Sequence, residues 1–478
     1  MFKIRPLLNA FVVLACGIGA VSAIPEFGWV EAGALRESGV LMCAGLMFSL
    51  LVATFRNPLA VFRTEHIVMF GLVYWLLLDT VQGAFDLPVE REGLVRIFIG
   101  TTVFGCFFWI GCALASYFGR RPAASPAAAP ATRSDIGPGF IVWGAIICAL
   151  LSLSYPVLTC QFTPSCLYDA VTAPRFGDWR IDHSWGTLKK FRYAGYLALP
   201  LTVAYFMIHR RWTFPGFLAI VLTAFVVMIA ANEGRRGFGT TVGAALMIFV
   251  LLRPRIRVRH LLGLIVGAAL LLLFLQAMLS WRDHGVGRSL LEGREITADR
   301  EGLIAVDKNI YHGSRAMAIV PEQHPHTGFR GLAATLLQPI PRSIWPDKPF
   351  MRGFFYAYTI QRRGDLGWTA TFSIIADMYV IGGWLGLVLG GMAYGGLAQM
   401  TSRLLVGGMT LRRRLMFAAA TMTLFVSLRA FHELSVTGFS VLALWGLFLM
   451  RDYFSQRVQS TVSSPDNWSV RATGSPAR

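Results

Sequence analysis

Basic residues stand in short turns between long apolar runs of this sequence. Arg235 and Arg236 lie between two such runs, Arg282 follows a third, and Arg429 ends a fourth. An ionisable side chain next to lipid is costly, so each of these positions is a candidate for function. Guanidinium groups bind phosphate through paired hydrogen bonds, and the four arginines therefore predict an anion-binding site. The alternatives are interfacial turns with snorkelling arginines and local ion pairs.

Four acidic or histidine residues in or beside the apolar runs and the long segment 281–369 could transfer a proton. His432 and Glu433 follow Arg429, Asp347 lies in a proline-rich stretch, and Asp377 lies within an apolar run. A carboxylate or an imidazole can act as a general acid or base. The alternative for Glu433 is a local ion pair with Arg429, one helical turn away. The sequence does not rank the four candidates.

The proline-rich stretch itself presents several groups that could contact a substrate. Four prolines between positions 339 and 349 exclude a regular helix there. The resulting extended segment presents Arg342, Trp345, Asp347 and Lys348, which combine cations, a carboxylate and an aromatic surface suited to a sugar ring. We therefore treat Arg342, Trp345 and Lys348 as candidate substrate contacts.

The composition indicates what kind of fold must position these residues. The chain has 478 residues, of which 55% are hydrophobic and 15% charged, whereas about a quarter of a soluble domain is charged. Many of the apolar runs approach the roughly 20 residues that cross a bilayer. They predict an all-α polytopic membrane protein with about twelve transmembrane helices. The predicted spans are roughly 7–24, 38–55, 66–85, 96–118, 138–158, 191–208, 214–232, 237–252, 261–280, 370–398, 415–431 and 435–450.

The positive charges indicate how these helices are oriented. A net charge of +18 in a soluble protein would suggest nucleic acid as a partner. With the N-terminus in the cytoplasm, however, the inside loops and tail hold 21 basic residues and four acidic ones. This is the positive-inside pattern. We therefore expect a multi-pass membrane protein with both termini cytoplasmic, whose partner is the lipid bilayer and not nucleic acid.

The spacing of the runs divides the chain into four predicted units. Helices 1–9 occupy residues 1–280, and a large periplasmic loop or cap occupies 281–369. Helices 10–12 then occupy 370–456, and a disordered cytoplasmic tail occupies 457–478. A loop as long as 281–369 far exceeds an ordinary connection and is predicted to be a folded cap or a functional loop.

The cysteines and the short motifs indicate which metal, cofactor and disulfide chemistry the sequence allows. Cys160 and Cys166 flank five residues of an outside loop, where either a disulfide or two free thiols would be compatible with the sequence. No cysteine or histidine spacing is typical of zinc, and no P-loop, HExxH or GxSxG motif occurs. We therefore expect no metal and no cofactor.

Three stretches together resemble a known family. The first is Ile340-Pro341-Arg342-Ser343-Ile344-Trp345-Pro346-Asp347-Lys348-Pro349, and the second runs from Thr369–Thr371 into Ala376-Asp377-Met378-Tyr379-Val380-Ile381-Gly382-Gly383-Trp384-Leu385-Gly386. The third is the hairpin Gly234-Arg235-Arg236-Gly237. With the twelve-span plan and the large outer loop, they resemble the bacterial Wzy-type polymerases of O-antigen and exopolysaccharide. Relatives often have Glu where this chain has Asp377.

The resemblance implies a metal-independent glycosyltransferase of the GT-C type in the bacterial inner membrane. It would transfer a growing glycan from undecaprenyl diphosphate onto a sugar hydroxyl of the next lipid-linked repeat unit, at the periplasmic face. By that analogy Arg235, Arg236, Arg282 and Arg429 would bind the diphosphate, and Arg342 and Lys348 would steady a lipid-linked substrate. Asp347, His432, Glu433 and Asp377 remain the candidates for the general base.

Two other functions fit the same features. An O-antigen ligase would use the same donor but transfer the glycan to lipid A core. A transporter of lipid-linked sugars or another solute would be favoured by discontinuous helices with charges near mid-membrane. For the polymerase, the expected partners are the undecaprenyl-diphosphate-linked oligosaccharide, a chain-length regulator and a flippase.

Overall fold

The computed structural model confirms an all-α protein. It describes residues 5–26, 28–84, 88–118, 136–172, 188–209, 211–253, 258–281, 284–295, 304, 306–340, 344–347, 371–406 and 410–462. In these ranges the strands are β1 (Trp29–Val30) and β2 (Val89–Glu90), which pair antiparallel. The helices are α1 (Arg5–Ser22), α2 (Arg36–Arg56), α3 (Thr64–Leu72), α4 (Leu78–Gln82), α5 (Arg91–Phe118), α6 (Pro138–Thr159), α7 (Pro164–Thr172), α8 (Ala198–His209), α9 (Phe214–Glu233), α10 (Arg235–Leu251), α11 (Val258–Ser280), α12 (Val286–Glu292), α13 (Asn309–Ile319), α14 (Gly328–Leu336), α16 (Ser373–Ser402), α17 (Leu411–Ser427) and α18 (His432–Val462).

Shorter helical turns complete these elements. They are η1 (Ala32–Leu35), η2 (Pro58–Phe62), the π-helical turn η3 (Val73–Leu77) between α3 and α4, η5 (Leu188–Leu197) before α8, and η6 (Arg403–Leu405) after α16.

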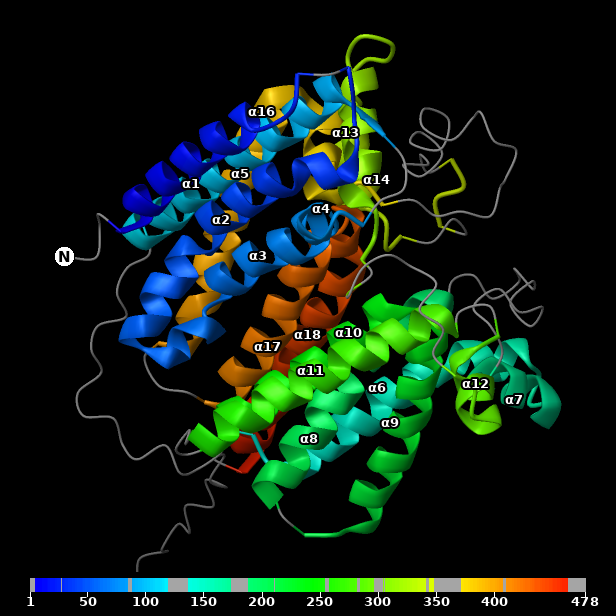
Figure 1. The fold of residues 1–478 in the computed structure, drawn as a ribbon. Helices are drawn as coiled ribbons and strands as arrows, with labels where there is room; N and C mark the ends of the chain where they lie inside the picture. Colours follow the sequence, from blue (N-terminus) through cyan, green and yellow to red (C-terminus); the bar gives the residue numbers. More distant parts are fainter. Residues whose placement is uncertain are drawn as a thin grey trace, which may run out of the picture.

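The helices pack around two main apolar cores. Figure 1 shows α1, α2, α3 and α5 on one side of the molecule and α6, α8, α9, α10 and α11 on the other, with α17 and α18 between them. The first core includes Leu46, Phe98 and Phe104, and the second includes Ile146 and Phe417. Because the end of α17 belongs to the first core and its beginning to the second, this helix joins the two groups. The predicted unit 1–280 therefore contributes to both cores.

The described helices support membrane insertion. Nine helical segments in the described ranges are long and apolar enough to cross a bilayer. They are Arg5–Ser22, Ala32–Arg56, Thr64–Gln82, Arg91–Phe118, Pro138–Thr159, Lys190–His209, Phe214–Asn232, Ser373–Leu405 and His432–Phe454. The other three predicted spans fall on α10 and α17, which have 17 residues each, and on α11, of which Ile265–Ser280 is a shorter apolar stretch. The membrane class is thus supported, and the total of twelve stays a prediction.

Helix α16 reverses direction, which corrects the prediction of one continuous span over 370–398. Gly382 and Gly383 have non-helical dihedrals, and Gly383 has φ 60° and ψ −146°, a conformation open to glycine. A Cβ added to Gly386 would lie 2.2 Å from the carbonyl oxygen of Met378. In one continuous helix, residues eight apart are separated by about 12 Å along the axis. Residues 373–381 therefore fold back against 384–402 as a helical hairpin.

A small cap formed by α7 and α12 covers one end of the second helix group. The disulfide between Cys160 and Cys166 closes the turn before α7. Asn232, near the end of α9, donates its side-chain amide to the Val171 carbonyl and accepts the Val286 N–H at 3.1 Å. Its side chain thus holds both cap helices at the point where the chain enters α10.

Candidate functional site

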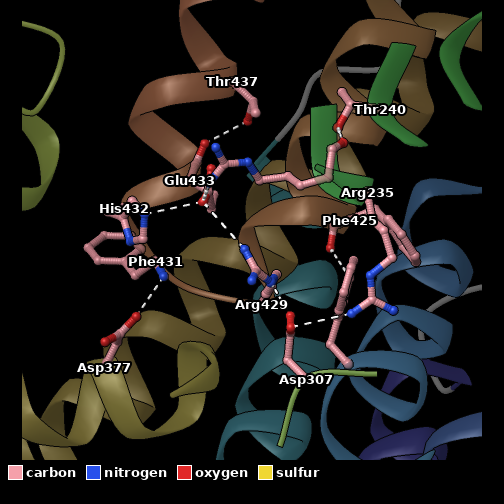
Figure 2. Close-up of polar contacts among 12 residues, drawn as sticks. Arg235, Thr240, Asp307, Asp377, Phe425, Arg429, Phe431, His432, Glu433 and Thr437 are labelled. Atoms are coloured by element: carbon pink, nitrogen blue, oxygen red, sulfur yellow. Dashed lines mark hydrogen bonds and ion pairs between the residues drawn. The ribbon is translucent and has the colours of Figure 1, made fainter. Parts of the chain in front are cut away.

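The turn between α17 and α18 carries the residues on which the site is built. This turn lies against the first segment of α16, since the N–H groups of Ser373 and Ile374 donate to the carbonyls of Arg429 and Leu428 at 3.0 and 2.9 Å. The Asp377 carboxylate accepts the N–H of Phe431 at 2.7 Å. Figure 2 shows Asp377 reaching this backbone from below, away from the arginines. Asp377 therefore positions the turn, and the hairpin of α16 is what brings it there.

Glu433 is the buried centre of the cluster. Its side chain is 0% exposed and forms an ion pair with Arg236, whose side chain is 18% exposed. The Glu433 carboxylate also lies 3.2 Å from His432 Nε2 and 4.0 Å from Arg429 Nη1. A carboxylate removed from water needs such partners, because an isolated buried charge is strongly unfavourable. Glu433 thus holds three cationic or imidazole groups around one point.

A second carboxylate lies on the other side of the arginines. Asp307, in the loop before α13, forms an ion pair with Arg429 and lies 3.6 Å from Arg235. Figure 2 shows Asp307 between these two guanidinium groups. The Arg429 guanidinium also lies 6.0 Å from the ring centroid of Trp75, within reach of a cation–π contact. The indole N–H of Trp75 donates to the Phe425 carbonyl at 3.1 Å, which fixes that ring.

The sharp connection from α9 to α10 places the two neighbouring arginines. Gly234 alone separates the helices and has φ 128°, which favours glycine. Arg235 and Arg236 therefore occupy the first turn of α10. Cations at a helix N-terminus oppose the helix dipole. Their presence there calls for compensating anions, which Asp307 and Glu433 supply in this structure.

We call Arg235, Arg236, Arg429, Asp307, His432 and Glu433 the arginine centre. Three guanidinium groups and two carboxylates leave one positive charge, with His432 as a further basic group. The side chains other than Glu433 are 15–21% exposed. Charge interactions are stronger in such a partly buried site than in water. Preset guanidinium groups can therefore bind an anion, and an imidazole beside them can accept a proton.

The sequence-predicted residues divide into three groups. Arg235, Arg236, Arg429, His432 and Glu433 come together in the arginine centre, and Asp377 supports it from behind. Asp347 is exposed and Trp345 partly buried, and the described residues show no contact between either and the centre. Arg282, Arg342 and Lys348 lie outside the described residues.

Asp307 and Trp75, which contact the arginines, were not among the residues predicted from the sequence. Asp307 and Trp75 contact the arginines from remote parts of the chain. An acidic residue in a long loop and an aromatic residue in an apolar run are common, so neither carried a distinguishing signal. In the parts of the chain that the structure describes, no group of three or more His, Cys, Asp or Glu residues could hold a metal ion.

Comparison with known protein families gives a match to part of the chain. Residues 314–450 match a family described as a domain of unknown function, DUF8712. The matched region contains α16, α17, the turn with Arg429 and the beginning of α18, but not Arg235, Arg236 or Asp307. No curated protein and no solved structure matches the chain.

Proposed function

We propose that this protein is a membrane glycosyltransferase that polymerises lipid-linked glycans. It transfers a growing glycan from undecaprenyl diphosphate onto a sugar hydroxyl of the next lipid-linked repeat unit. In this proposal twelve helices cross the inner membrane, both termini are cytoplasmic, and the arginine centre faces the periplasm. The GT-C class and the kinship with Wzy-type polymerases are part of the proposal and rest on the sequence resemblance.

The observation that carries the proposal is the convergence of Arg235, Arg236 and Arg429 on one partly buried point. Their side chains are 15, 18 and 17% exposed. Three guanidinium groups from two separate parts of the chain therefore meet at the two carboxylates of Asp307 and Glu433. A diphosphate leaving group develops negative charge as its bond to the sugar breaks, and preset cations stabilise that charge.

The geometry favours His432 as the general base. Its side chain is 21% exposed, and its Nε2 lies 3.2 Å from the Glu433 carboxylate. Asp377 is occupied by the backbone of Phe431, and Glu433 is fully buried beside Arg236. Asp347 is exposed in another loop. Among the four candidates, His432 combines a partly exposed side chain with a neighbouring carboxylate that would stabilise its protonated form. Its Nε2 is buried against that carboxylate, which leaves Nδ1 to accept the proton.

The proposed step is a single displacement that inverts the anomeric carbon. The acceptor hydroxyl oxygen forms the new bond to that carbon while its proton passes to His432. The bond from the carbon to the diphosphate oxygen breaks, and its electron pair leaves with undecaprenyl diphosphate. Arg235 and Arg429 stabilise the leaving oxygens, and Glu433 stabilises the imidazolium.

Reconstitution in lipid vesicles tests the proposal. Wild-type protein supplied with undecaprenyl-diphosphate repeat units should lengthen the glycan, as resolved on a gel. Arg429→Gln should slow this reaction by about 10- to 100-fold, as expected for losing a hydrogen bond to a charged group. His432→Gln should slow it by about 100-fold or more, as expected for losing a general base. Arg288→Gln, at an outer ion pair with Asp169, is the matched control and should retain activity.

Two outcomes would contradict this function. Unchanged chain growth in both Arg429→Gln and His432→Gln would remove the arginine centre from the reaction. Transfer to lipid A core, with no growth on repeat units, would instead identify an O-antigen ligase.

One observation favours a second candidate, a transporter of lipid-linked sugars or another solute. Residues 373–381 fold back against 384–402, and such discontinuous helices occur at transport sites. A transporter would move the lipid-linked repeat unit across the vesicle membrane without lengthening it. Measuring translocation and chain growth in the same vesicles separates the two functions.

A further inference from the structure

We propose that Asp307 occupies the place of a substrate phosphate and that its carboxylate is exchanged for that phosphate when a diphosphate binds. Asp307 would then be an internal competitor for the arginine centre. This inference rests on the proposed function, because it assumes that the centre binds a diphosphate.

The contacts of Asp307 match those expected of a phosphate oxygen pair. Its Oδ2 accepts from Arg429 Nε, and its Oδ1 lies 3.6 Å from Arg235 Nη2. Figure 2 shows the carboxylate joined to both guanidinium groups, of which Arg235 belongs to α10 and Arg429 to the turn between α17 and α18. Arginine forks bind carboxylate and phosphate through the same planar geometry. The position between Arg235 and Arg429 is therefore suited to either anion.

The two carboxylates of the centre differ in how firmly they are held. Glu433 is 0% exposed and lies in the first turn of α18. Asp307 is 21% exposed and precedes α13, outside any helix. A carboxylate on a partly exposed loop can leave an ion pair at a lower cost than one that is fully buried. Glu433 is thus the fixed counter-ion, and Asp307 is the exchangeable one.

Contacts on both sides of Asp307 hold its loop while leaving the carboxylate partly exposed. The Gln82 amide donates to the Ile304 carbonyl and accepts the Ile304 N–H, both at 2.9 Å. The Asn309 side chain donates to the Trp75 carbonyl at 2.7 Å. These anchors determine the fraction of molecules in which the Asp307 carboxylate is paired with Arg235 and Arg429. Weakening an anchor should therefore favour an incoming anion.

Competition of this kind predicts the direction in which the affinity for diphosphate changes when Asp307 is replaced. With Asp307 in place, three guanidinium groups and two carboxylates leave one positive charge, and without it they leave two. The apparent affinity of a ligand is reduced by the fraction of protein in which its site is occupied by something else. Removing the competing carboxylate should therefore tighten diphosphate binding. A residue that only aligned the arginines would have the opposite effect when removed.

Calorimetric titration of the full chain in detergent micelles tests the exchange, with inorganic diphosphate and farnesyl diphosphate as probes at fixed ionic strength. Asp307→Asn should bind both probes about two- to fivefold more tightly than wild type, the size expected for one partly exposed ion pair. Asp169→Asn removes a carboxylate from the outer ion pair with Arg288 and should bind as wild type does. Unchanged or weaker binding by Asp307→Asn would overturn the proposal.

Gln82→Ala is the second variant, because it leaves the arginine centre intact and weakens the loop anchor. It should also tighten binding, and unchanged or weaker binding would overturn the proposal even if Asp307→Asn does not fold. Failure of wild type and both variants to bind either probe would refute the diphosphate site itself. Equal affinity for the two probes would support the exchange of Asp307 for diphosphate, but it would contradict a lipid-linked donor, because the isoprenoid chain of farnesyl diphosphate would then add nothing to binding.

Discussion

The ion pair between Arg236 and Glu433 predicts a large loss of stability when only one partner is removed. Glu433 is 0% exposed, so Arg236→Met would leave a buried carboxylate near His432 and Arg429 alone. Breaking a buried pair costs about 3–5 kcal/mol. The two remaining neighbours offset part of this cost, so we expect about 3 kcal/mol, or roughly a hundredfold in the unfolding equilibrium.

The outer pair Arg288–Asp169 provides a matched comparison. Its side chains are 43 and 44% exposed, and the atoms lie 2.7 Å apart. An exposed pair of this kind contributes about 0–1 kcal/mol, so Arg288→Met should be nearly neutral. The double variant Arg236→Met with Glu433→Gln should recover most of the lost stability, because it removes the charge that had become unpaired. Glycan extension should be lost in both Arg236 variants.

The measurement is equilibrium unfolding in dodecyl maltoside micelles titrated with sodium dodecyl sulfate, followed by the helical circular dichroism signal. Two results would refute the reasoning. One is a loss in Arg236→Met no larger than that in Arg288→Met. The other is a double variant as unstable as Arg236→Met, which would mean that the cost comes from lost packing and not from the buried charge.

Three further predictions concern the elements that support the site. Asn232→Ala should lower the free energy of unfolding by about 2–3 kcal/mol, because Asn232 is 4% exposed and its side chain hydrogen-bonds to both α7 and α12. Limited proteolysis should then cleave the cap faster, and an unchanged digest would contradict this role of Asn232. Gly383→Ala should lower the free energy of unfolding by about 1–3 kcal/mol, because a φ of 60° strains any residue with a side chain. Gly382→Ala is the control, since Gly382 has φ −145° and nothing lies within 4 Å of an added Cβ. Equal melting temperatures of the two variants would argue against the hairpin of α16. Burial, reinforced by Arg315, lowers the pKa of His312 to about 4, so the unfolded chain takes up this proton first as the pH falls, and stability is lost between about pH 6.5 and 4. His312→Gln should show a flatter melting temperature over that range, and a curve parallel to that of wild type would contradict the prediction.

Some of the site could be predicted because its signals are local in the sequence. Arg235 and Arg236 stand in the short hairpin 232–237 between apolar runs, and Arg429, His432 and Glu433 stand in another short turn. A charge beside a predicted span is visible from the neighbouring residues alone. The proline-rich stretch carried an equally local signal, but the described Trp345 and Asp347 do not join the centre.

Other parts depended on distances along the chain that no local pattern encodes. Asp377 is one of four sequence candidates for the general base because it lies deep in an apparent span, and in the structure its carboxylate accepts the backbone N–H of Phe431. The reversal at Gly382 and Gly383 is the reason, because it turns what hydropathy describes as one long helix into two segments. Hydropathy averages over a window and does not register a change of direction within an apolar run.

By itself the sequence determined the class of the protein, an all-helical membrane fold, and the charged turns available for chemistry. Those features follow from the cost of placing polar groups in hydrocarbon, which acts on each segment separately. The tertiary structure alone decided the pairings, such as Arg236 with Glu433 across 197 positions and Arg429 with Asp307 across 122. An ion pair depends on where two helices or loops meet, and that is set by the packing of the two cores.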